Sequence, residues 1–98
     1  KLLVKAVNTS SLTNATNDVV TLAAAITGAA QGFTYKDANA VNINTVGATN
    51  GITTNGGAVT LTTVAAGAIT STVTTGNITT TAAAQSITIT LGAAAPAP

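Results

Sequence analysis

Few side chains in this sequence could carry out acid–base or metal chemistry. There is no histidine or cysteine, and the only carboxylates are Asp18 and Asp37. The chain therefore lacks the usual general bases, thiol nucleophiles and transition-metal ligands. The two aspartates precede corresponding repeat segments, so a glycosidase-like pair or a calcium site with Asn17 or Asn39 are alternatives. We favour solvated corner residues, with Asp37 balancing Lys36, and predict a non-enzymatic protein with no catalytic, cofactor-binding or metal-binding residues.

Threonine hydroxyls are the other candidates for chemistry, because Thr occupies 22 of the 98 positions. In four segments a Thr follows a bulky apolar residue, which predicts an outward Thr ladder able to contact a surface. Its members are Thr34, Thr53, Thr70 and Thr88. Thr is a favoured exposed residue of strands, which is the simpler interpretation. The second interpretation is an ice-binding face, because flat Thr ladders can order water.

These threonines belong to two interleaved series of short alternating segments. The first series is VTLA, VNIN, VTLT and ITTT, which begin at Val20, Val41, Val59 and Ile78. The second series is FTYK, ITTN, ITST and ITIT, which begin at Phe33, Ile52, Ile69 and Ile87. Both series keep nearly the same interval between their starts, which predicts a structural repeat of roughly 19 residues.

Strand alternation assigns the two faces of each segment. The first apolar residue of every segment is predicted to point inward, and the following Thr or Asn outward. Phe33 and Tyr35 are expected to fill a wider part of the interior. Glycine- and asparagine-rich stretches such as Asn50-Gly51 separate the segments. We interpret them as corners of a coil rather than hairpins, although Asn-Gly also favours hairpin turns.

A repeat of this length with two or three short strands predicts an all-β fold, a parallel β-solenoid of about 4–5 coils of roughly 19 residues. Residues 1–91 would form the repeats, with residues 1–17 as an incomplete leading coil, and residues 92–98 an Ala/Pro tail or linker. A β-sandwich is the rival fold. No charged cap is visible at either end, so we expect the end strands to pair with neighbouring coils or with a second copy.

Composition excludes two classes of partner. With only three basic residues and a net charge of +1, the chain has no basic stripe for nucleic acid. No apolar run approaches the ~20 residues of a membrane-spanning helix, so we expect no membrane span. One Phe, one Tyr and no Trp or Met leave mostly small residues for the core. This favours a thin interior with closely stacked backbone layers.

The repeats resemble the β-strand-repeat regions of large bacterial surface proteins, the filamentous-haemagglutinin-like adhesins and autotransporter passengers. The resemblance rests on NDVVTLAAAITGAAQGFTYKDANAVNINTVGATNGITTNGGAVTLTT, residues 17–63, and extends more loosely to Leu91. It implies a right-handed parallel β-helix exported to the bacterial cell surface, with a stalk, scaffold or adhesive role. A host or abiotic surface would then be a partner. A self-assembling extracellular filament subunit is the alternative.

Overall fold

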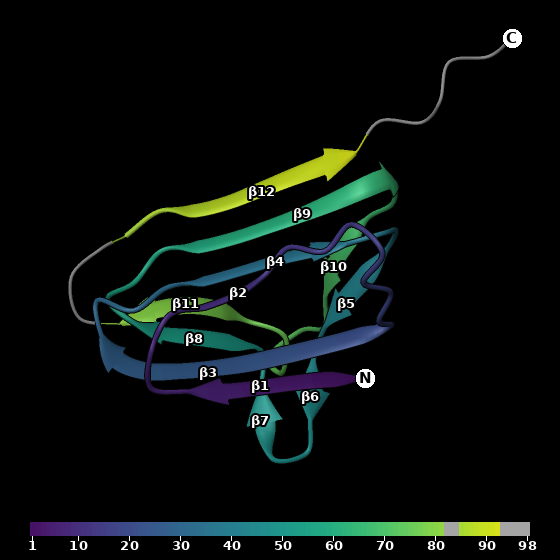
Figure 1. The fold of residues 1–98 in the computed structure, drawn as a ribbon. Coiled ribbons are helices and arrows are strands. Elements are labelled where there is room, and N and C mark those ends of the chain that lie inside the picture. Colours follow the sequence, from purple (N-terminus) through teal and green to yellow (C-terminus); the bar gives the residue numbers. More distant parts are fainter. Residues whose placement is uncertain (82–84, 93–98) are drawn as a thin grey trace, which may run out of the picture.

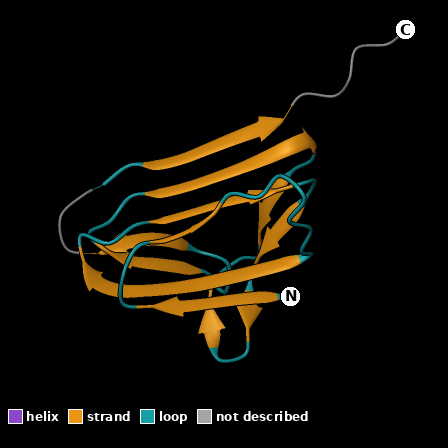
Figure 2. Ribbon diagram, in the orientation of Figure 1, coloured by secondary structure: helices purple, strands orange, loops and turns teal. Residues whose placement is uncertain are grey.

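The computed structural model describes residues 1–81 and 85–92, which form β-strands and no helix (Figure 2). In chain order, the strands are β1 (Leu2–Ala6), β2 (Ser10–Leu12), β3 (Thr21–Ala29), β4 (Phe33–Asp37), β5 (Val41–Ile43), β6 (Thr45–Val46), β7 (Thr49–Asn50), β8 (Ile52–Asn55), β9 (Val59–Ala66), β10 (Ile69–Ser71), β11 (Ile78–Thr81) and β12 (Ile87–Gly92). The predicted all-β class is confirmed.

Two parallel sheets contain most of these strands (Figure 1). Sheet A has the order β10-β5-β3-β8-β11, with β1 paired to β3, and it curls into a half-barrel. Sheet B has the order β12-β9-β4-β2. Every pairing inside the two sheets is parallel, whereas β6 and β7 form a separate antiparallel hairpin.

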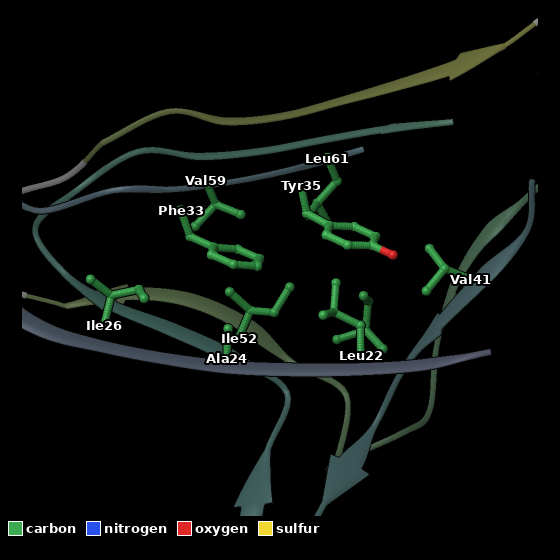
Figure 3. Close-up of a cluster of buried hydrophobic side chains, with 10 residues drawn as sticks. Leu22, Ala24, Ile26, Phe33, Tyr35, Val41, Ile52, Val59 and Leu61 are labelled. Carbon is green, nitrogen blue, oxygen red and sulfur yellow. The ribbon is translucent and has the colours of Figure 1, made fainter. Parts of the chain in front are cut away.

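The core lies between the inner faces of the two sheets, as Figure 3 shows. Sheet B contributes its largest members, Phe33 and Tyr35, together with Val59 and Leu61. Sheet A contributes Leu22, Ala24, Ile26, Val41, Ile43 and Ile52. The two aromatic rings supply the width that the small residues cannot, so the expectation that they fill the interior is confirmed.

Alternation explains why these segments are strands. In β4 the side chains of Phe33, Tyr35 and Asp37 are buried, and those of Thr34 and Lys36 are half-buried on the opposite face. Aromatic and β-branched residues favour this half-buried extended conformation. The same inward assignment is confirmed in β5 and β9, where the first and third residues are buried.

The predicted register holds for one step and is wrong beyond it. Thr21 pairs with Asn42, as expected, although Val20 just before it is 76% exposed and does not point inward. The later members of the predicted stack have other partners. Val41 pairs with Ile69, and Ile78 pairs with Ile52.

The later steps between strand partners are longer than the first, in place of the constant interval that we predicted. Leu2 pairs with Leu22 in sheet A. In sheet B, Phe33 pairs with Val59, and Val59 pairs in turn with Ile87. Each of these later steps takes more residues than the first, so the interval is not constant.

An inserted hairpin explains the longer spacing. On β3, Leu22 and Ala24 are separated by a single residue, but their partners Ile43 and Ile52 stand on either side of β6 and β7. The β6–β7 hairpin projects from the body of the molecule in Figure 1. A second loop, residues 72–77, separates β10 from β11 at the corresponding position. These excursions add residues to the later passes without adding rungs to the stack.

The stretch that contains Asn50-Gly51, which we interpreted as a corner, forms this hairpin, but its turn is at residues 47–48 and Asn50 ends β7. Gly47 has a φ of +62° in the turn between β6 and β7, a conformation that glycine adopts without steric cost. A true corner occurs at Gly57, where an added Cβ would overlap the carbonyl oxygen of Gln31. Here two passes of backbone touch directly. One glycine-rich stretch is thus a hairpin and another is a corner of stacked backbone.

The predicted chain divisions can be placed in part. Strands β1 and β2, in the predicted leading coil of residues 1–17, pair with β3 and β4. Apart from Gly92, which ends β12, the predicted tail of residues 92–98 lies outside the described residues.

Candidate functional site

The four threonines of the predicted ladder lie in three different columns. Thr34 and Thr88 share a column of sheet B, in which Thr60 stands between them. Thr53 belongs to sheet A, where it pairs with Ala25 and Thr79. Thr70 is also in sheet A and pairs with Asn42. The predicted four-membered column is therefore not formed, because it depended on a constant coil length.

A different group of threonines is brought together on the outer face of sheet B. One column is Thr34, Thr60 and Thr88, and Ser11 of β2 extends it beside Thr34. The next column is Lys36, Thr62 and Thr90. We call the five threonines of these columns the Thr array: Thr34, Thr60, Thr62, Thr88 and Thr90. Thr88 and Thr90 are exposed, and the other three are half-buried.

The bulkiest part of the core holds the Thr array in place. Phe33 and Tyr35 alternate with Thr34 along β4, and their rings are stacked with centroids 6.4 Å apart and planes 4° from parallel. Val59 and Leu61 alternate with Thr60 and Thr62 in the same way, and they pair directly with the two aromatic residues. All four inward side chains are at most 1% exposed. The buried core therefore holds in place the backbone of β4 and β9, the two central strands that present the array.

The hydroxyls of the Thr array are also free of protein partners among the described residues. Several Thr hydroxyls elsewhere bond within the protein. Thr54 donates to the carbonyl oxygen of Gly57 at 2.5 Å, Thr63 to that of Gly67 at 3.1 Å, and Thr81 to that of Thr54 at 3.0 Å. The array side chains lie on the outer face of sheet B, opposite the buried core. Its donors and acceptors face outward.

Asp37 corrects the prediction for the carboxylates. We expected a solvated corner residue, but the side chain is fully buried, whereas Asp18 is exposed as predicted. The Asp37 carboxylate accepts three hydrogen bonds: from the Tyr35 hydroxyl at 2.6 Å, and from the backbone N–H groups of Val19 at 3.0 Å and Asn39 at 3.1 Å. Lys36 points to the opposite face of β4, so it does not balance this charge.

The buried pair has an internal role. Burial raises the pKa of the Tyr35 phenol above its usual value, and the hydrogen bond to Asp37 adds to this rise. A phenol that stays protonated is a hydrogen-bond donor and not a nucleophile. By accepting from Val19, Asp37 ties β4 to the segment that leads into β3. Asn17 strengthens the same link, because its side-chain amide donates to the carbonyl oxygen of Lys36 at 3.2 Å.

The calcium alternative gains no further ligands from the described residues, where no three His, Cys, Asp or Glu side chains are grouped. The same residues contain no helix of the length and hydropathy needed to cross a membrane.

A second candidate surface lies along β12, an edge strand that pairs only with β9 among the described strands. Ile87 and Ile89 pair with Val59 and Leu61, which places them on the core side of sheet B. They are nevertheless 44% and 48% exposed, and no described strand pairs with the other edge of β12. We call this strip of backbone and side chains the open edge. Ile87 was predicted to point inward, and it lies on that side without being buried.

Comparisons of this chain with protein-family models, with curated proteins and with solved structures found no match. Its function is therefore inferred from the Thr array and from the open edge.

Proposed function

We propose that this chain is a structural β-solenoid segment of a secreted bacterial surface fibre or adhesin, in which it acts as stalk or scaffold. In this proposal the successive passes of the chain are coils of a right-handed parallel β-helix. They carry no chemistry and serve to hold a rigid, elongated shape outside the cell. Attachment to a host or abiotic surface would be the task of the assembly that contains the segment.

The pairing order supports the solenoid. Strands β1, β3, β8 and β11 come in this order along the chain and lie side by side in sheet A. Strands β2, β4, β9 and β12 do the same in sheet B. The chain thus alternates between the two sheets, and each of the last two passes adds two parallel strands to sheet A and one to sheet B. Our sequence prediction gave all coils one length, but the circuit joining Val59 to Ile87 is longer than the circuit joining Leu2 to Leu22.

The open edge is the observation that carries the scaffold role. Unpaired backbone groups on an edge strand are a template for a further strand. Along β12 this template is accompanied by Ile87 and Ile89, whose inward side chains are half uncovered. One more coil would pair with the backbone and cover both side chains. A protein that acted as a self-contained globule would be expected to protect such an edge with charge, proline or a covering loop.

Two copies joined in tandem test this proposal. In a solenoid, stability is approximately a sum of coil terms and interface terms between neighbours. If the second copy stacks on the open edge, the tandem chain should unfold at a higher temperature than a single copy. The same tandem with Ile89→Lys in its first copy should lose that gain, and Thr53→Lys, on the outer face of sheet A, should retain it. Equal melting temperatures for single and unsubstituted tandem chains would refute the proposal.

A self-assembling filament subunit is the second candidate, because the opposite end of the stack is also unprotected. There β2 pairs only with β4, and β1 only with β3, among the described strands, and Val7 and Leu12 are 65% and 36% exposed. When the open edge of one copy meets β1 and β2 of the next, the contact is head-to-tail. Such a contact propagates into a filament. Negative-stain images and sedimentation over a range of concentrations distinguish the candidates: filaments that Ile89→Lys abolishes favour the subunit, and a stable monomer favours the stalk.

A further inference from the structure

The Thr array is built for a partner different from the neighbouring coils of the scaffold. It faces outward from sheet B, at right angles to the stacking direction, so stacking leaves it uncovered. Parallel strands are ~4.8 Å apart, and alternate residues along a strand are ~6.6 Å apart. The threonines therefore form a two-dimensional grid of methyl and hydroxyl groups with two fixed repeats.

Charge and shape limit what this grid can bind. The five threonines carry no charge, and Lys36 is the one charged residue in the two columns. A neutral grid matches a neutral partner and gives no attraction to phosphate or to an anionic lipid surface. Sugar-binding surfaces use exposed aromatic faces, but Phe33 and Tyr35 both point into the core, where they are at most 1% exposed.

We propose that the Thr array binds ice, with its hydroxyls and methyl groups holding a layer of water in a lattice arrangement. The inter-strand repeat is close to the shorter oxygen repeat on the prism faces of hexagonal ice, and the repeat along a strand is somewhat shorter than the longer one. The array hydroxyls have no protein partner among the described residues, so they can bond to such water. The rigid core beneath Thr34, Thr60 and Thr62 fixes the grid before contact, which lowers the entropy that binding would otherwise cost.

Lys36 interrupts the neutral surface of the Thr array and provides a direct test of the proposal. It stands in the column of Thr62 and Thr90, at the place where a third Thr would complete two rows of three. A charged ammonium is strongly hydrated and does not fit a lattice of ordered water. Replacing it with Thr should extend the grid without touching the core, because residue 36 lies on the outer face of β4.

The test is thermal hysteresis and the shaping of single ice crystals by the purified chain at millimolar concentration. We expect both activities in the unsubstituted protein, a loss of most of the hysteresis in Thr60→Lys, and a gain in Lys36→Thr. Thr53→Lys is the matched control: the same substitution at an exposed strand residue of sheet A, outside the array, should leave the hysteresis unchanged.

Circular dichroism and the melting temperature establish that each variant is folded. A folded chain that neither shapes ice nor depresses the freezing point would overturn the proposal. Equal losses in Thr60→Lys and Thr53→Lys would also overturn it, as would retention on powdered crystalline polysaccharide without any effect on ice. The proposal does not depend on the scaffold role, since stacking is measured by the tandem melting temperature and ice binding by hysteresis.

Discussion

Removing the hydroxyl of Tyr35 tests a buried hydrogen bond between two side chains. Tyr35 is 1% exposed and Asp37 is fully buried, and the phenol donates to the carboxylate at 2.6 Å. In Tyr35→Phe the ring keeps its place against Phe33, but the carboxylate loses one of three donors. Hydrogen bonds to charged groups contribute ~1.5–3 kcal/mol each. We expect the free energy of unfolding to fall by an amount in that range.

The assay is urea or thermal unfolding followed by circular dichroism. For a domain of this size a loss of about 1 kcal/mol lowers the melting temperature by about 4–8 °C, so the change should be plain. Thr53→Val is the matched control, because it removes an exposed hydroxyl and should change stability by less than ~0.5 kcal/mol. Asp37→Asn should also destabilise, since an amide nitrogen would then face one of the N–H or O–H donors.

The double variant Tyr35→Phe with Asp37→Asn identifies the cause. If the two side chains act through their shared hydrogen bond, the double variant should cost less than the sum of the single ones. Strict additivity would show that they act separately. A cost below ~0.5 kcal/mol for Tyr35→Phe would refute the assignment of a buried, charge-assisted bond at this position.

Three further predictions follow from the same structure. Because folding raises the pKa of Tyr35, the contribution of its protonated phenol to the free energy of unfolding is complete below about pH 10 and is lost at higher pH, by up to ~1.4 kcal/mol per pH unit. The absorbance of this single tyrosine should show ionisation at a higher pH than for a free tyrosine. Tyr35→Phe should remove this loss of stability. Gly57→Ala should cost about 3 kcal/mol or more in denaturant unfolding, because its Cβ would overlap backbone, whereas Gly47→Ala, with no contact closer than 3.7 Å, should cost only about 1 kcal/mol through its positive φ. Thr60→Cys with Thr88→Cys should form a disulfide on mild oxidation, seen as a mobility shift that reducing agent reverses, since paired strands bring the two Cα atoms to ~4.8 Å.

The faces of the central strands could be predicted from the sequence because they depend only on alternation. Val41, Val59 and Phe33 were each assigned inward, and each is buried. Alternation also contained a signal that we did not use. Residue 37 continues the alternation of Phe33 and Tyr35, so the pattern alone places Asp37 inward. Its charge led us to the solvated interpretation, and the three hydrogen bonds that make burial tolerable were not visible in the sequence.

The columns of the candidate site could not be predicted in the same way, because columns depend on register. The pairs Thr60/Thr62 and Thr88/Thr90 have the same Thr-x-Thr spacing and stand side by side, which was the available signal for the Thr array. Many segments of this chain share the same pattern of alternation, so several registers would bury the apolar side chains equally well. Side-chain pattern fixes which face a residue occupies, and it leaves open which strand lies beside it.

The length of the connections decides between those registers, and this is where the sequence pattern carries least information. Gly-rich stretches look alike whether they turn a corner, as at Gly57, or form a projecting hairpin, as at Gly47. With every such stretch taken as a corner, Thr60 is predicted to pair with Thr79; with the loop of residues 72–77 added to the next circuit, it pairs with Thr88. The cysteine pair Thr60→Cys with Thr79→Cys therefore complements the pair at 60 and 88. Only one of the two can cross-link within a single chain, and cross-linking of the 60/79 pair alone would restore the shorter, constant coil of the sequence prediction.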